Sequence, residues 1–162
     1  MQEGESKGIM SGQQTFQRIT QATIEEHRQI NFYLDQVHQS VAALRGDAPS
    51  VEPMRRLAAQ IEGLKERLAE HHQAEEVGGL FQALLDALPD CRVEISRLTN
   101  QHEKHIEILE MARIHALHGQ LGEVDALRDD LKSFLEMFRD HERNEEQLLR
   151  RALEREGKAA IE

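Results

Sequence analysis

The sequence predicts an all-α fold, an antiparallel up-down-up-down four-helix bundle. Leu, Ala, Glu, Gln and Arg are abundant and favour helices, whereas strand-forming aromatic residues are few. Apolar residues recur at alternating steps of three and four along four long segments, as they do on the buried face of a helix. Short breaks containing Gly or Pro separate these segments, and helices joined by short connections pack as antiparallel neighbours.

The first helix is predicted from about residue 16 to about residue 45, where the break RGDAPS follows. Its apolar stripe consists of Phe16, Ile19, Thr23, His27, Ile30, Leu34, Val37, Val41 and Leu44. Pro53 suits the first turn of the second helix. The stripe of that helix consists of Met54, Leu57, Ile61, Leu64, Leu68, His71 and Glu75. Gly78 and Gly79 are expected to kink or end it, with a further turn or two through FQALLDAL.

The third helix is predicted to follow Pro89 and Asp90 and to end at the breaks near Gly119 and Gly122. Its stripe consists of Ile95, Leu98, His102, His105, Leu109, Ala112 and Ala116. The fourth helix precedes a polar tail at Gly157. Its stripe consists of Val124, Leu127, Leu131, Phe134, Phe138, His141, Glu145, Leu148 and Ala152.

Length, charge and cysteine content bound the class of protein. A chain of 162 residues fits one domain, and we expect a disordered or vector-derived tail over residues 1–14 and the bundle over residues 15–156. The formal charge of −10 argues against nucleic acid as a partner. The sequence has no apolar run of about 18 residues, so we do not expect a membrane partner. One cysteine, Cys91, can form no internal disulfide, so we expect a cytoplasmic protein.

Among the polar residues on the stripes are six, four histidines and two glutamates, that occupy positions where a helix of this kind buries apolar side chains, so we expect them to point into the core. They are His27, His71, Glu75, His102, His141 and Glu145. Burying an unpaired carboxylate costs roughly several kcal/mol, and a bound cation would supply the compensating charge. The four histidines lie at similar distances from the expected turns, so a single cluster is predicted.

The spacing HxxxE occurs twice, and each occurrence follows a lone core histidine. A His and a Glu at positions i and i+4 share one helical face, so the imidazole can hold one metal ion while the carboxylate bridges to another. Imidazole and carboxylate ligands without thiolate favour mid-row divalent metals, and bridging carboxylates favour a di-iron or di-manganese centre.

These four elements in this order resemble the hemerythrin-like family, also called the HHE cation-binding domain, over nearly the whole chain after the tail. The resemblance implies a hemerythrin-like bundle around two non-haem iron ions that share carboxylate and oxo bridges. It implies that Glu75 and Glu145 form the carboxylate bridges. It also implies that His27 and His71 bind one iron, while His102 and His141 bind the other.

The chain departs from the oxygen carriers of that family at two places. They have a fifth histidine one turn before the ligand of the third helix, where this chain has Leu98, and they end in HxxxxD, where it has HxxxE. His105 either supplies a fifth nitrogen ligand or orients a neighbour from outside the coordination sphere. We expect His72 to be a partly exposed neighbour. If the buried stripes of the second and fourth helices were shifted by one residue, Glu76 and Glu146 would point inward instead of Glu75 and Glu145.

The resemblance leaves several functions open. We expect a module that binds or senses oxygen or nitric oxide at a vacant coordination position near Leu98. The alternatives are an enzyme that removes peroxide in a catalase-like or peroxidase-like manner, and a protein for iron storage or repair of iron centres. A metal-free interaction bundle fits poorly with two buried carboxylates. The sequence identifies no protein partner.

Overall fold

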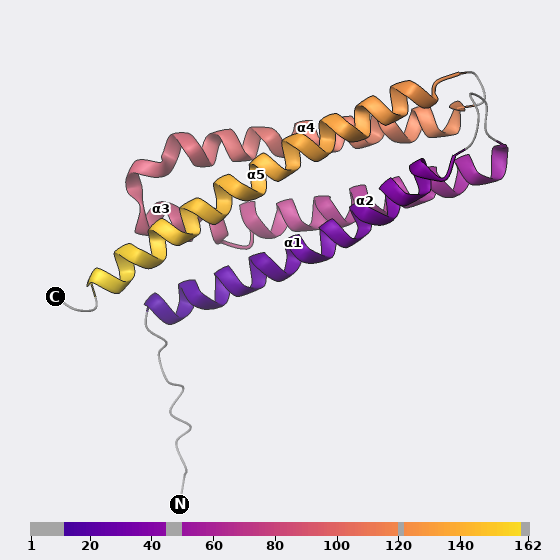
Figure 1. Cartoon of the computed structure of the whole chain (residues 1–162). Coiled ribbons are helices and arrows are strands. Elements are labelled where there is room, and N and C mark those ends of the chain that lie inside the picture. The colour runs from indigo at the N-terminus through magenta and orange to yellow at the C-terminus, as the bar shows by residue number, and fades with distance from the viewer. Residues whose placement is uncertain (1–11, 45–49, 120–121, 160–162) are drawn as a thin grey trace, which may run out of the picture.

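The computed structural model describes residues 12–44, 50–119 and 122–159, and helices dominate all three stretches (Figure 1). The long helices in these stretches are α1 (Gly12–Ala42), α2 (Val51–Glu76), α4 (Arg92–Leu117) and α5 (Val124–Ala159). A short helix α3 (Leu80–Ala87) and a 3₁₀ turn η1 (Pro89–Cys91) connect α2 to α4.

The long helices form a ring in which α1 packs on α2, α2 on α4, α4 on α5, and α5 back on α1. Neighbours in this ring run in opposite directions (Figure 1). Short α3 lies at the end of the bundle where α1 begins and α5 ends. The predicted antiparallel four-helix bundle is therefore confirmed. None of the described helices combines the length and apolar content that crossing a bilayer requires.

The observed ends of α1 and α5 differ from the predicted ones. Helix α1 begins at Gly12, so residues 12–14 of the expected tail are helical, while residues 1–11 lie outside the described residues. The same helix ends at Ala42, and Arg45, the predicted end, also lies outside them. Helix α5 continues to Ala159, beyond residue 156, the predicted end of the bundle.

Two glycines produce the break between α2 and α3. The backbone of Gly79 has φ 103°, a left-handed conformation that side-chain-bearing residues rarely adopt. A Cβ atom on Gly78 would collide with the carbonyl oxygen of Ala74. The chain therefore ends α2 here and starts the two-turn helix that FQALLDAL predicts.

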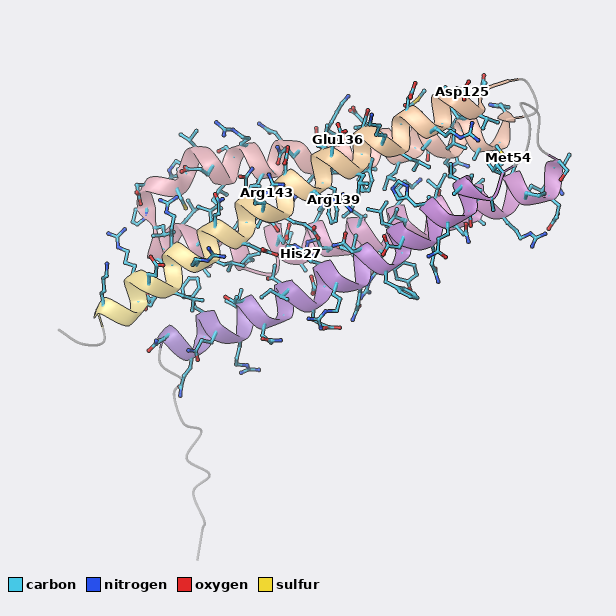
Figure 2. The ribbon with its side chains drawn as sticks, in the orientation of Figure 1. His27, Met54, Asp125, Glu136, Arg139 and Arg143 are labelled. Atoms are coloured by element: carbon cyan, nitrogen blue, oxygen red, sulfur yellow. The ribbon has the colours of Figure 1, made fainter. Side chains whose placement is uncertain are left out.

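The stripes face inward and divide the core into two apolar clusters, while the outer faces carry charged side chains such as those of Glu136, Arg139 and Arg143 (Figure 2). One cluster lies toward the α1–α2 and α4–α5 connections and includes Ile30, Ile61, Leu109, Leu131, Phe134 and Phe138. The other lies toward α3 and includes Phe16, Phe81, Leu84, Leu98, Leu148 and Leu149. A layer of polar side chains separates them.

We expect Phe134→Ala to lower the free energy of unfolding by about 3–5 kcal/mol, because Phe134 is fully buried and its removal leaves a cavity. Urea unfolding of the metal-free protein, followed by circular dichroism, measures the change. Phe32→Ala is the matched control, since Phe32 is 61% exposed and its truncation should change stability by less than about 0.5 kcal/mol. Equal losses for both variants would contradict the assignment of the core.

Candidate metal centre

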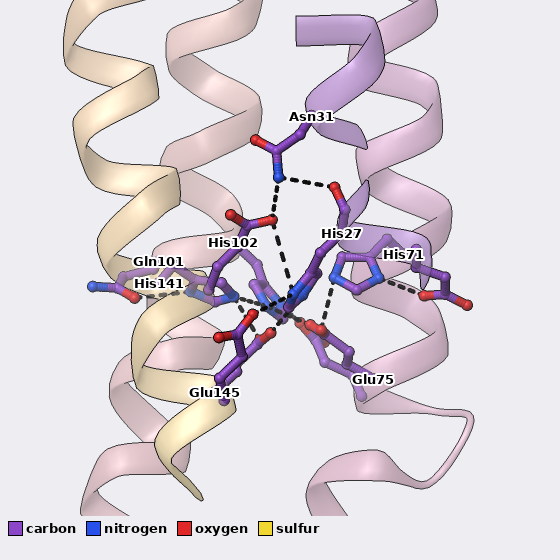
Figure 3. A network of polar contacts seen from close by, with 12 residues as sticks. His27, Asn31, His71, Glu75, Gln101, His102, His141 and Glu145 are labelled. Atoms are coloured by element: carbon purple, nitrogen blue, oxygen red, sulfur yellow. Dashed lines mark hydrogen bonds and ion pairs between the residues drawn. The ribbon is translucent and has the colours of Figure 1, made fainter. Parts of the chain in front are cut away.

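Six polar residues of the stripes, the predicted metal ligands other than His105, meet in the layer between the two apolar clusters (Figure 3). Each helix of the ring contributes at least one of them: α1 His27, α2 His71 and Glu75, α4 His102, and α5 His141 and Glu145. None of the six is more than 4% exposed. The prediction that they point inward is confirmed.

Their nitrogen and oxygen atoms form two overlapping groups, each of which could hold a metal ion. The first group consists of His27, His71, Glu75 and Glu145. The second consists of His102, His141, Glu75 and Glu145. Within each group the candidate ligand atoms lie within 4.8 Å of one another, and the two glutamates belong to both.

Each shared carboxylate directs one oxygen toward each histidine pair. For Glu75, Oε1 lies 2.8 Å from Nε2 of His71 and Oε2 lies 3.0 Å from Nε2 of His102. For Glu145, Oε2 lies 3.0 Å from Nε2 of His27 and Oε1 lies 2.7 Å from Nε2 of His141. Two carboxylates placed between two pairs of imidazoles have the arrangement that bridging of two cations requires.

These short contacts do not have hydrogen-bond geometry. Both oxygens of Glu75 and of Glu145 are buried without a hydrogen-bond partner, and so are Nε2 of His27 and Nε2 of His71. Buried polar atoms in native proteins are nearly always paired. This many unpaired atoms at one place therefore need an explanation. A cation bound within each group would accept lone pairs from the atoms that face it, so the residues present fit cations.

Glutamates outside the cluster orient two of the imidazoles. Nδ1 of His71 lies 2.6 Å from Oε2 of Glu26, and Nδ1 of His102 lies 2.5 Å from Oε1 of Glu76. A carboxylate acceptor at Nδ1 fixes the tautomer that leaves Nε2 free to bind a metal, and it makes the imidazole more basic. Both rings are therefore held ready for a cation at Nε2.

The other two imidazoles have different outer partners. Nδ1 of His141 lies 2.9 Å from Oε1 of Gln101, a neutral amide. Nδ1 of His27 lies 3.8 Å from Oε1 of Glu142, which is too far for a direct hydrogen bond. Asn31 donates to this Glu142 oxygen at 2.9 Å and to the carbonyl oxygen of His27 at 2.9 Å. The side chain of Asn31 thereby ties the outer carboxylate to the backbone beside the His27 ring.

Electrostatic balance in the cluster favours protonated imidazoles when no cation is bound. Burial lowers the pKa of His71, but Glu75 and Glu26 outweigh burial and raise it to about 9. Carboxylates raise the pKa of His27 and of His102 against the same effect of burial. Burial also raises the pKa of Glu145, but the neighbouring imidazoles hold it well below its usual value. A cation that binds here displaces protons and takes over their charge.

His72 lies in the cluster, and the prediction that it is partly exposed is wrong. It is 5% exposed, and its ring stacks on the ring of His102 with centroids 3.8 Å apart and planes 9° apart. Burial, together with the imidazoles of His102 and His105, lowers the pKa of His72 to about 2. The sequence did hold a signal, because Leu64, Leu68 and His72 follow one another at steps of four and widen the buried face of α2.

His105 is fully buried as its stripe position predicts, but it stands outside both groups of ligand atoms. Its ring lies edge-on to His141, with centroids 4.9 Å apart, and contacts the rings of Phe134 and Phe138. Burial and the neighbouring His141 lower its pKa to about 3. Of the two roles predicted for His105, a position outside the coordination sphere fits this geometry better than ligation.

The alternative inward pair of glutamates is wrong. The side chain of Glu76 is 38% exposed and reaches His102 from outside the cluster, while that of Glu146 is 49% exposed. Leu98 is buried in the apolar cluster next to α3, so the position that carries a further histidine in the oxygen carriers is apolar here.

Comparison with known protein families identifies a match over most of the chain. The family model described as hemerythrin HHE cation binding domain matches residues 18–153, a range that contains all the residues of the cluster. No curated protein and no solved structure matches the chain.

We expect Glu145→Ala to lower the amount of bound metal per chain, because it removes a candidate oxygen ligand from both groups at once. Metal analysis of purified protein grown with added iron measures the content. The adjacent variant Glu146→Ala is the control, since the exposed Glu146 belongs to neither group. Full metal content in Glu145→Ala would rule out a bridging role.

We expect Glu26→Ala to weaken metal binding about 10–100-fold, because His71 then lacks the carboxylate that orients its ring. Competition with a coloured chelator measures the affinity. Glu25→Ala serves as the matched neighbour, since Glu25 pairs with Arg28 on the exposed face of α1. If both variants bind metal equally well, the outer carboxylate has no orienting role.

Proposed function

Because the chain belongs to the hemerythrin HHE cation-binding domain family, we propose that its buried cluster holds two iron ions and binds or senses dioxygen or nitric oxide. The observation that carries this proposal is the position of Glu75 and Glu145, each with one oxygen directed toward each histidine pair. Carboxylates placed in this way are typical of centres with two metal ions.

In this proposal His27 and His71 hold one ion and His102 and His141 hold the other. Each position has four candidate ligand atoms, two nitrogens and two oxygens. Iron in sites rich in imidazole and carboxylate keeps open positions, where it can exchange electrons with small ligands. Manganese accepts similar ligands, so metal analysis has to distinguish the two.

The donor set excludes the soft-metal alternatives. The only cysteine of the chain, Cys91, is buried in the apolar cluster next to α3, where its thiol faces the carbonyl oxygen of Leu84 at 3.8 Å. It therefore supplies no thiolate to the cluster. Imidazole and carboxylate without thiolate favour iron or manganese over copper(I) or an iron–sulfur cluster.

The surroundings of the cluster suit a small, weakly polar ligand. On the side toward α3, Phe81 stacks on His102 with centroids 5.6 Å apart, and Leu98 lies in the same apolar cluster. On the opposite side Phe138 contacts the rings of His27 and His105. These apolar walls exclude bulk water from the imidazoles, and small diatomic molecules partition readily into such surroundings.

A route to the surface lies beside the second histidine pair. A pocket of about 510 Å³ opens to solvent between α2 and α4. His72, Glu76, Val77, His102 and Ile106 are among its lining residues. Since this pocket reaches His102, we propose that ligands approach the centre from there.

Removal of peroxide is the second candidate, because the same opening would admit hydrogen peroxide to the second histidine pair. Iron storage or repair of iron centres has less support from the geometry, since six ligand side chains enclose positions for only two ions.

We expect iron-loaded protein to contain two irons per chain and, after reduction, to change its visible spectrum reversibly with oxygen or nitric oxide. Anaerobic titration followed by removal of the gas measures binding and its reversal, with zinc-loaded protein as the redox-inactive control. Sustained evolution of oxygen from added peroxide would favour the enzyme instead. Absence of bound iron after anaerobic loading would contradict both functions.

A further inference from the structure

Two buried histidines, His72 and His105, belong to neither group of metal ligands. We propose that they form the N–H donor side of a pocket for a small anionic ligand of the class of peroxide or azide, held next to the His102–His141 position. This inference rests on the proposed di-iron centre and deepens it, because it states which ligands the centre prefers. It predicts that these two imidazoles contribute more to the affinity for anions than to the affinity for neutral nitric oxide.

The first support is the set of unpaired nitrogens. Nε2 of His72 and both ring nitrogens of His105 are buried without a hydrogen bond of normal geometry among the described residues, although the backbone of Met137 lies near enough to the His105 ring to raise its pKa. His72 is 5% exposed and His105 is fully buried. A buried imidazole without partners is costly, and a ligand or an ordered water that accepts its N–H removes that cost.

The second support is location. The ring of His72 lies flat on His102, and the ring of His105 lies edge-on to His141, so both rings contact the second pair of metal ligands. The centroids of His72 and His105 are themselves 5.6 Å apart. No comparable contact of His105 with His27 or His71 exists among the described residues. The extra imidazoles therefore serve one of the two metal positions.

The third support is access. The pocket of about 510 Å³ between α2 and α4 is lined by both His72 and His102. A ligand in this pocket contacts both His72 and His102, a candidate ligand of the second metal position. His105 lies deeper, against the stacked rings of Phe134 and Phe138.

Hydrogen-bond chemistry sets the preference for anions. An imidazole ring carries at least one N–H, so each of these rings can donate. Hydrogen bonds to a charged acceptor are roughly twice as strong as those between neutral groups, and apolar surroundings strengthen them further. Nitric oxide is neutral and accepts such bonds weakly, so it gains little from the same two donors.

The test uses iron-loaded protein and compares two ligands. Azide is titrated into air-oxidised protein and nitric oxide into reduced protein, and absorbance gives each affinity. The variants are His72→Phe, which preserves a ring on His102, and His105→Phe. His105→Gln restores a donor, and His118→Phe at the exposed end of α4 is the control. Iron content is measured for every protein.

We expect His72→Phe and His105→Phe each to weaken azide binding about tenfold or more, as loss of a hydrogen bond to a charged group does. Nitric oxide binding should change less than about threefold, and iron content should stay at two per chain. His105→Gln should recover most of the azide affinity, and His118→Phe should match the parent protein. If His105→Phe does not fold, His72→Phe and His105→Gln still decide the matter.

Unchanged azide affinity in His72→Phe, with full iron content, would overturn this inference and leave the di-iron centre intact. Loss of one iron in His105→Gln or His105→Phe would also overturn it, because His105 would then be a ligand. Absence of iron from the parent protein would instead refute the proposed function, and this inference with it.

Discussion

Two carboxylates buried in the middle of an apolar bundle impose the constraint on which this structure depends. Glu75 and Glu145 have almost no exposure, and burial of isolated charges costs far more than a small domain can tolerate. Positive charge must therefore lie beside them. Protons on His27, His71 and His102 meet this need in the metal-free protein, and a bound cation would meet it better because it would also use the unpaired oxygens.

The constraint explains how the core is organised. Apolar clusters lie on both sides of the polar layer, one toward α3 and one toward the opposite end, so the helices are held together without help from the charged groups. Side chains such as Phe81 and Phe138 belong to these clusters and also touch imidazoles of the layer. Packing thus fixes the ring positions before a metal binds, which reduces the reorganisation that binding requires.

The two metal positions are not equivalent. Around the first, Glu26 and Glu142 provide outer acids, and the only further imidazole close to it in the described part of the chain is His72, at 6.1 Å from His71. Around the second, one ligand faces Glu76 and the other the neutral Gln101, and two extra imidazoles lie against the ligand rings. Outer groups of this kind change ligand basicity and the polarity met by an incoming molecule. The asymmetry is the basis for proposing that small ligands bind on the His102–His141 side of the centre.

The sequence by itself determined the four helices, the break at Gly78 and Gly79, and the six inward polar residues. Each of these follows from the period of a single helix or from local backbone chemistry, as with His141 and Glu145 one turn apart on the stripe of α5. Only the tertiary structure decided which groups surround these six polar residues. Which oxygen of Glu75 faces which histidine, the approach of Gln101 to His141 and the stacking of His72 on His102 all depend on how neighbouring helices are rotated and staggered. The period of one helix carries no information about that rotation, because it fixes only which residues share a face.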